Sequence, residues 1–192
     1  LLLRMRDEAQ LAGVIAHEAS HFLLKHQIRS WRDMKRKTNI FAALAMAAGV
    51  AGGATGTYTG DLVRLAELGT MLTLFRYSRQ LEAESDALGL KLIADAGYSP
   101  ISMSETWDQL ITELEWSARE RRKRVRRDFS LFSTHPAPRE RLRDLDLSAR
   151  EYAVAGKSYE RGRERYLQAL QPIRQTLFED QVRLNDPGAS QY

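Results

Sequence analysis

The chain has 192 residues, a hydrophobic content of 43%, no cysteine, and a formal net charge of +4 from 29 basic and 25 acidic side chains. This length and apolar content suit one folded domain with an appended module, which excludes a disordered chain, and the small net charge gives no indication of a nucleic acid partner. Without cysteine the chain has no disulfides, thiolate zinc fingers or cysteine nucleophiles, so any metal must be held by His, Asp or Glu. The abundance of Ala, Leu, Glu, Arg and Lys favours a mainly helical fold, in which any small β element is minor.

The first predicted element is a helix over about residues 7–28, in which apolar residues recur at three- and four-residue spacing. We interpret it as a central core helix with Ile15 and Phe22 in its apolar stripe. It contains AHEASH, in which His17 and His21 bracket Glu18. Helical residues four apart differ by about 40° around the axis, so the two imidazoles project from one face and can bind one ion. Glu18 lies about 100° away, where it can accept a proton from a water without being a ligand.

This short motif alone leaves open a structural interpretation, in which both histidines are core residues bonded to backbone carbonyls. A metzincin would have a third histidine at position 27 and a glycine at position 24, but the chain has Gln27 and Leu24. That subclass is excluded. A catalytic zinc site therefore needs its third protein ligand from elsewhere, and a carboxylate on a second helix is the alternative.

An uncharged run covers residues 38–60, directly after the basic residues 35–37. It is long enough to cross a bilayer, and the basic flank would suit a cytoplasmic end. However, it consists mostly of Ala, Gly and Thr, and the next apolar segment contains Arg64 and Glu67. We interpret residues 38–60 as a buried or interfacial helix followed by a loop, in contact with a membrane surface, in preference to a transmembrane hairpin.

The next predicted helix covers residues 61–96 and ends at GYSP, because Gly97 can cap a helix and Pro100 cannot continue it. Further helices are predicted from residue 102 to about 127, after a Pro-containing loop up to about Leu147, and across residues 149–185 with interruptions at Gly156 and Pro172. The run RERRKRVRR at residues 119–127 is interpreted as a solvated basic segment, with binding to an anionic lipid surface or an acidic partner as the alternative.

Three segments together resemble the HtpX-like and CAAX prenyl protease family of zinc metallopeptidases, whose members are HExxH gluzincins. Within this family, the three segments most resemble the periplasmic BepA-like branch. These segments are AHEASH, SRQLEAESD and STHPAPRER, and the resemblance covers about residues 7–147. The family's second motif is approximately Ser-Arg-x-x-Glu-x-x-Ala-Asp. Ser78, Arg79, Glu82 and Asp86 match it, with Ser85 where alanine is usual.

The resemblance implies that Glu82 is the third zinc ligand beside the two histidines, and that Asp86 orients a ligand histidine through its other ring nitrogen. It also implies that His135 lies near the zinc, where it either caps the open coordination position or assists the transition state. Arg141 matches the arginine that follows, although Arg139 and Arg143 offer the same charge nearby. Two further residues are predicted to lie outside the site. Glu84 points about 200° away from Glu82 around its helix and is interpreted as a solvated residue. His26 lies about 140° away from His21 and is interpreted as a surface or core histidine.

The sequence thus predicts a mainly α gluzincin-type metallopeptidase domain over residues 1–147 and a C-terminal helical extension over residues 148–192 that begins a helical-repeat module. We expect that part of the natural protein precedes Leu1. The predicted function is zinc-dependent hydrolysis of peptide bonds, with one zinc ion per chain. The resemblance places it in envelope protein quality control, in the bacterial periplasm or on a membrane. The alternative is a zinc-stabilised, chaperone-like interaction module whose fourth zinc position is closed by His135.

Overall fold

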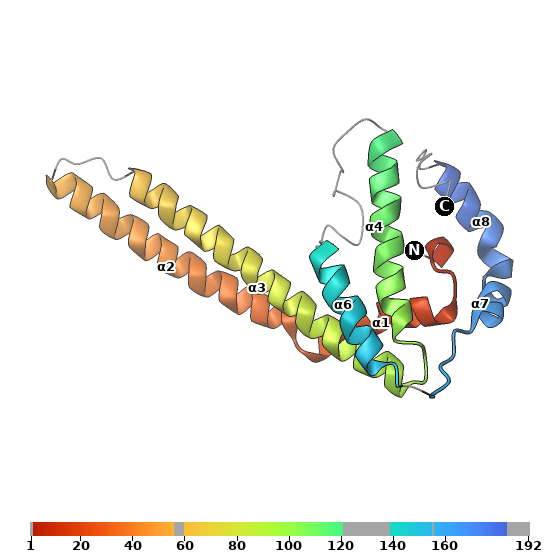
Figure 1. Ribbon diagram of the computed structural model, residues 1–192. Coiled ribbons are helices and arrows are strands. Elements are labelled where there is room, and N and C mark those ends of the chain that lie inside the picture. The colour runs from red at the N-terminus through yellow and green to blue at the C-terminus, as the bar shows by residue number, and fades with distance from the viewer. Residues whose placement is uncertain (1, 56–59, 121–138, 155, 184–192) are drawn as a thin grey trace. The chain divides into compact units, whose positions relative to one another are not determined.

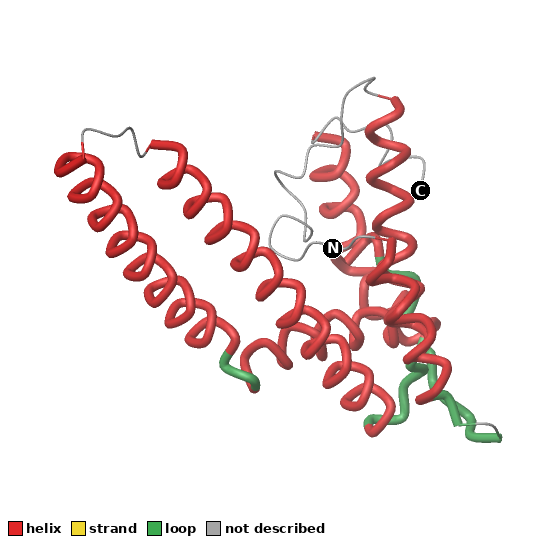
Figure 2. Tube along the Cα trace, turned by 60° about the vertical axis from the view of Figure 1, so that its left-hand side comes forward, coloured by secondary structure: helices red, strands yellow, loops and turns green. Residues whose placement is uncertain are grey.

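The computed structural model describes residues 2–55, 60–120, 139–154 and 156–183, and these ranges are mainly helical, as predicted (Figures 1 and 2). Within them no strand occurs, and one isolated parallel bridge joins Tyr98 to Glu160. The elements in chain order are η1 (Leu2–Arg4), α1 (Glu8–Leu23), α2 (His26–Thr55), α3 (Gly60–Asp95), α4 (Ile101–Glu120), α6 (Arg139–Tyr152), α7 (Arg163–Leu170), η2 (Gln171–Ile173) and α8 (Arg174–Arg183).

The chain forms two compact units, which are described separately. The hairpin unit comprises residues 21–84, and the core unit comprises residues 1–20 and 85–192. The division between them passes through two continuous helices, between Ser20 and His21 of α1 and between Glu84 and Ser85 of α3. Residues that are neighbours along either helix therefore keep helical spacing across the division.

In the hairpin unit, α2 lies beside the first part of α3 (Figures 1 and 2). The helix predicted within residues 38–60 is confirmed, and it continues without interruption from the basic residues 35–37. Several of its large apolar side chains are exposed, among them Ile40, Leu44 and Met46. Among the described residues, none of the helices is both long and apolar enough to span a bilayer.

The predicted single helix over residues 7–28 is wrong at its C-terminal end. The structure ends α1 at Leu23 and begins α2 at His26. Lys25 between them has a φ of 54°, in the left-handed region, and its N–H donates to the carbonyl of Phe22 at 3.0 Å. A left-handed residue stops a right-handed helix, but lysine gives no local signal for that conformation, whereas glycine does.

Replacing Lys25 with glycine is therefore expected to stabilise the protein by up to about 1 kcal/mol, since relief of the left-handed strain exceeds the entropy cost of glycine. Urea unfolding would measure the change in the free energy of unfolding. Lys35→Gly is the matched control: it places glycine inside α2 and should lower that free energy by about 1 kcal/mol. Destabilisation by Lys25→Gly as large as in the control would contradict this interpretation.

The core unit packs parts of α1, α3, α4 and α6 around one apolar cluster. Its buried members are Ala16, Leu90, Ile93, Met103, Trp107, Leu110, Ile111, Leu145 and Ala149. A Cβ added to Gly89 of α3 would lie 3.0 Å from Met103 Cε and 3.4 Å from the backbone nitrogen of His17. Glycine at this position therefore allows the backbones of α1 and α3 to approach closely beside His17.

The C-terminal helices follow the predicted order with changed boundaries. Gly97 has a φ of 85° after α3, as the predicted cap requires, and α6 continues to Tyr152, past the predicted end near Leu147. On α7, Tyr166 and Leu170 are buried against Met5 of the N-terminal segment, and the Tyr166 hydroxyl donates to the Leu2 carbonyl at 2.6 Å. This contact packs the C-terminal helices of the core unit onto its N-terminus.

Candidate metal centre

Helix α1 presents the two histidines of AHEASH at helical spacing. His17 is buried, with an exposed fraction of 1%, whereas the His21 side chain is 15% exposed. The stripe predicted to be buried is not, because Ile15 and Phe22 are 58% and 82% exposed. Glu18 is also exposed. The face of α1 that carries Glu18 is therefore accessible to water, while His17 reaches into the core.

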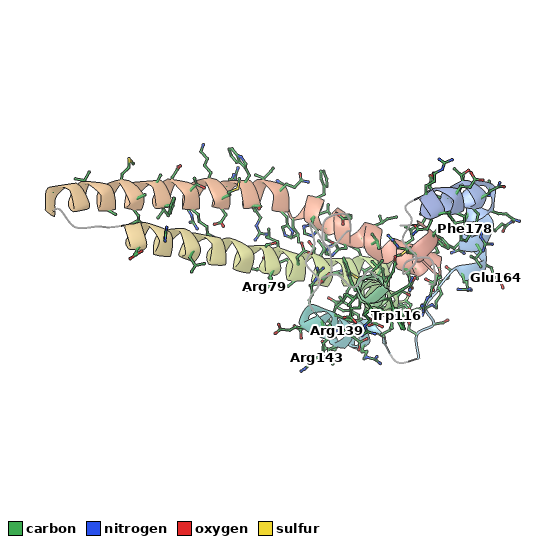
Figure 3. All side chains as sticks on the ribbon, turned by 90° about the horizontal axis from the view of Figure 1, so that it is seen from above. Arg79, Trp116, Arg139, Arg143, Glu164 and Phe178 are labelled. Atoms are coloured by element: carbon green, nitrogen blue, oxygen red, sulfur yellow. The ribbon has the colours of Figure 1, made fainter. Side chains whose placement is uncertain are left out.

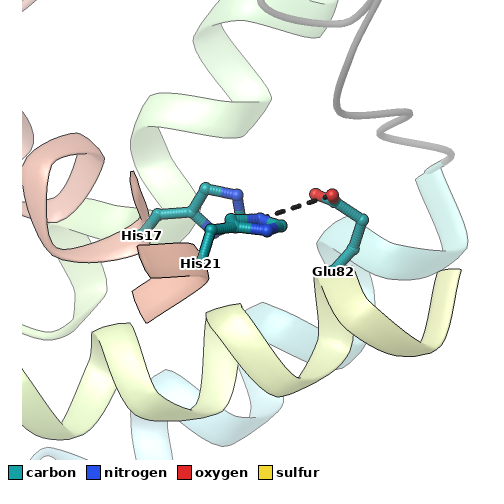
Figure 4. Close-up of side chains that lie close together, drawn as sticks. All are labelled: His17, His21 and Glu82. Atoms are coloured by element: carbon teal, nitrogen blue, oxygen red, sulfur yellow. Dashed lines mark ion pairs between the residues drawn. The ribbon is translucent and has the colours of Figure 1, made fainter. Parts of the chain in front are cut away.

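Helix α3 brings Glu82 to His21. The carboxylate is almost fully buried, and its Oε1 lies 3.4 Å from His21 Nε2 (Figure 4). Ligand atoms at about 2.1 Å from a tetrahedral zinc ion lie about 3.4 Å from one another. The separation of these two atoms therefore fits two ligands of one ion.

His17 completes a group of three. One ligand atom each from His17, His21 and Glu82 lies within 4.8 Å of the others (Figure 4). Two imidazoles and one carboxylate are a donor set found in catalytic zinc sites, where the fourth position is left for water or substrate. The residues present thus fit a metal ion, and the three predicted ligands are brought together.

Asp86 and Arg141 support His17 from within the core unit. Asp86 Oδ1 lies 3.0 Å from His17 Nδ1, and Arg141 donates to the same carboxylate from Nε at 2.7 Å and from Nη2 at 2.8 Å. Burial would raise the pKa of Asp86, but the hydrogen bonds from Arg141 and His17 outweigh it, so that pKa is lowered. An ionised Asp86 beside Nδ1 favours the tautomer of His17 that carries its proton on Nδ1 and a lone pair on Nε2.

Trp107 packs against both Arg141 and His17. The Arg141 guanidinium lies 4.8 Å from the centre of its ring, and the His17 ring meets it edge-on with centroids 5.7 Å apart. Arg139 and Arg143, the two alternatives to Arg141, are both exposed (Figure 3), and Arg139 donates to Glu115. The structure therefore distinguishes Arg141 from its neighbours by its burial and by its pairing with the buried Asp86.

His21 also contacts His26, which was not predicted from the sequence. His26 is buried at 2% exposure, and its Nδ1 lies 3.0 Å from His21 Nδ1. Its Nε2 lies 3.3 Å from Oε2 of Glu84. Glu84 was predicted to be solvated, but it is half-buried, and Arg29 donates to it at 2.6 Å. The hydrogen bonds from Arg29 lower the pKa of Glu84 to about 2, although burial opposes the shift. Burial lowers the pKa of His26.

One predicted site residue, His135, lies outside the described residues, and nothing in the structure places it.

Several known proteins are similar to this chain. The model of peptidase family M48 matches residues 1–149. The beta-barrel assembly-enhancing protease of Escherichia coli (strain K12) is 31% identical over 151 residues, which cover 74% of this chain and 28% of that protein. The metalloprotease LoiP of the same strain is 29% identical over 144 residues, covering 75% of this chain and 51% of LoiP.

A eukaryotic relative, the mitochondrial metalloendopeptidase OMA1 of Schizosaccharomyces pombe, is 25% identical over 146 residues, which cover 76% of this chain and 38% of OMA1. No solved structure gives a significant match. The chain therefore spans between about a quarter and about half of the length of these three relatives.

Proposed function

The chain belongs to peptidase family M48, and from that premise we propose that it is a zinc-dependent metalloendopeptidase in which His17, His21 and Glu82 hold one zinc ion. The observation that carries the proposal is the convergence of these three ligand atoms, with Asp86 beside Nδ1 of His17. A histidine whose Nδ1 proton is engaged offers Nε2 as the ligand atom.

When bound, zinc would supply a Lewis acid that polarises the scissile carbonyl and acidifies the attacking water. The remaining chemistry belongs to side chains. Glu18 follows His17 directly on α1 and is exposed, so its carboxylate accepts the proton of the attacking water and then donates it to the leaving amine. Asp86 keeps the His17 proton on Nδ1, and Arg141 holds Asp86 in place.

Two further residues, His135 and Arg141, belong to this proposal. We propose that His135 acts near the ion, where it either closes the fourth coordination position or assists the transition state. Arg141 is part of the site, and its two hydrogen bonds to Asp86 favour a positioning role for it. Comparing casein cleavage by wild type and His135→Ala distinguishes the two roles of His135, because activity seen only in the variant indicates autoinhibition.

The substrate class follows from the relatives. The first of them is named as a protease that enhances β-barrel assembly. By analogy we propose that this chain cleaves misfolded or incompletely assembled envelope proteins, in the bacterial periplasm or at a membrane. We further propose that residues 1–147 are the peptidase domain, that residues 148–192 begin a helical-repeat module, and that residues 38–60 touch a membrane surface. The exposed apolar side chains of α2, next to the basic residues 35–37, support the last point.

Removal of the metal tests the proposed function. Purified protein is expected to contain about one zinc per chain and to cleave casein, and a chelator should abolish cleavage until zinc is returned. His21→Ala should lose both the stoichiometric metal and the activity, because it deletes one of three ligands. Metal analysis by mass spectrometry together with fluorescent casein would measure both quantities. Cleavage that persists undiminished in the metal-free protein would overturn the proposal.

A further inference from the structure

The four side chains behind His21 form one connected path inside the hairpin unit. His21 Nδ1 lies 3.0 Å from His26 Nδ1, and His26 Nε2 lies 3.3 Å from Glu84 Oε2. Arg29 then donates to both oxygens of Glu84, at 2.6 Å and 3.2 Å, and Gln80 donates to Oε1 at 3.0 Å. The path begins at a proposed metal ligand and ends at a fixed positive charge.

The contact between the two Nδ1 atoms requires one proton, on one of the two rings. If His21 donates, its own proton is on Nδ1 and its Nε2 carries a lone pair. If His26 donates, a neutral His21 carries its proton on Nε2, where it would occupy the lone pair that a metal needs. The two arrangements have the same distance between the rings, so this contact alone does not select either.

Glu84 selects between them. Its two oxygens already accept hydrogen bonds from Arg29 and Gln80, which is the arrangement of a carboxylate, and a carboxylate can only accept. His26 Nε2 must then carry the proton, because otherwise its lone pair would face the Glu84 oxygen in a buried setting. A neutral His26 with its proton on Nε2 has a lone pair on Nδ1, and so accepts from His21.

We propose that His26 and Glu84 are positioning residues that keep His21 in the tautomer whose Nε2 can bind the metal. The inference rests on the proposed function, since it gives His21 the role of a ligand. It assigns His21 a support that matches the one of His17, where Arg141 and Asp86 perform the same task. The difference is that a second imidazole lies between the ligand and the carboxylate.

Spectroscopy of the metal-free protein tests the tautomers directly. Long-range nitrogen–proton correlation spectra distinguish a proton on Nδ1 from one on Nε2, and we expect Nδ1–H for His21 and Nε2–H for His26 at neutral pH. Glu84→Gln supplies an amide that can donate to His26 Nε2, so a fraction of His26 should change to the Nδ1–H form. A wild-type His26 that carries its proton on Nδ1 would overturn the proposal.

Metal affinity provides the second measurement. Glu84→Gln should weaken zinc binding by about 10- to 100-fold, the effect typical of losing an outer partner of a ligand histidine. His26→Asn breaks the path, so adding Glu84→Gln to it should change affinity by less than about twofold. Asp95→Asn is the matched control, since it converts a remote carboxylate of α3, paired with Lys91, and should leave affinity unchanged.

The outcomes separate this inference from the proposed function. An equal loss of affinity from Glu84→Gln in wild-type and His26→Asn backgrounds would show that Glu84 acts independently of His26, and would overturn the inference while casein cleavage still depends on zinc. Conversely, cleavage without any metal would overturn the proposed function, whereas the tautomers of His21 and His26 are measured in the metal-free protein.

Discussion

Replacing Glu18 with glutamine is expected to reduce casein cleavage by about 10²- to 10⁴-fold, the contribution typical of a positioned general base. Stoichiometric zinc should remain, because the proposed ligands are His17, His21 and Glu82. Glutamine keeps the length of the side chain but cannot accept the proton of the attacking water, and it cannot return that proton to the leaving amine. The substitution therefore removes the chemistry without removing the site.

Initial rates of casein cleavage and zinc content would be measured on the same preparations. Glu164→Gln is the matched control, since Glu164 is an exposed carboxylate on α7 (Figure 3) that has no proposed role in the site, and its activity should equal that of the wild type. Near-normal cleavage by Glu18→Gln would show that another group serves as the base. Loss of zinc in this variant would show instead that Glu18 is needed to hold the ion.

Replacing Asp86 with alanine is expected to lower the free energy of unfolding by about 3–5 kcal/mol, the cost of leaving one partner of a buried ion pair. Arg141 would lose its carboxylate while its side chain is only 11% exposed. His17 would lose the acceptor beside Nδ1, so zinc affinity should fall by about 10- to 100-fold in addition. Both effects come from one carboxylate because it accepts from the arginine and the histidine together.

Urea unfolding and zinc titration would measure the two effects separately. Asp146→Ala is the control for stability: it breaks the Asp146–Arg150 pair, whose side chains are 34% and 65% exposed, and should cost much less. The double variant Asp86→Leu, Arg141→Met should regain most of the stability, because it leaves no buried charge unpaired, but not the zinc affinity. If stability and affinity returned together, the Asp86–His17 contact would have no part in metal binding.

Most helices could be predicted from the chain because their signals are local. The helix predicted over residues 61–96 is observed as Gly60–Asp95, since its end depends on Gly97 and Pro100, whose backbone preferences hold in any context. The break at Lys25 could not be predicted, because it depends on a left-handed conformation that lysine does not favour. The same break is why the contact between His26 and His21 was not predicted. Counting along one uninterrupted helix placed His26 on a different face from His21.

The three proposed ligands were predictable for a related reason. Helical spacing alone brings His17 and His21 to one side of α1, and the resemblance of the second motif identified Glu82. The partners of those ligands were harder to predict. Helical spacing correctly predicts that Glu84 points away from Glu82. It does not predict whether the side of α3 that carries Glu84 contacts water or another side chain. In the structure Glu84 contacts His26 and Arg29, so a carboxylate interpreted as solvated is connected to His21 through His26.

The amino-acid sequence was thus sufficient to predict most of the helices, the residue types of the proposed metal site and the family, because each depends on spacing within one helix or on residue type. Tertiary packing alone decided which residues contact the proposed ligands. Arg141, and not its exposed neighbours, pairs with the Asp86 carboxylate beside His17, and His26 lies between His21 and Glu84. Hydrogen bonds and ion pairs act over about 3 Å. Such contacts join residues more than 50 positions apart, as Arg29 and Glu84 are, only once the helices have packed.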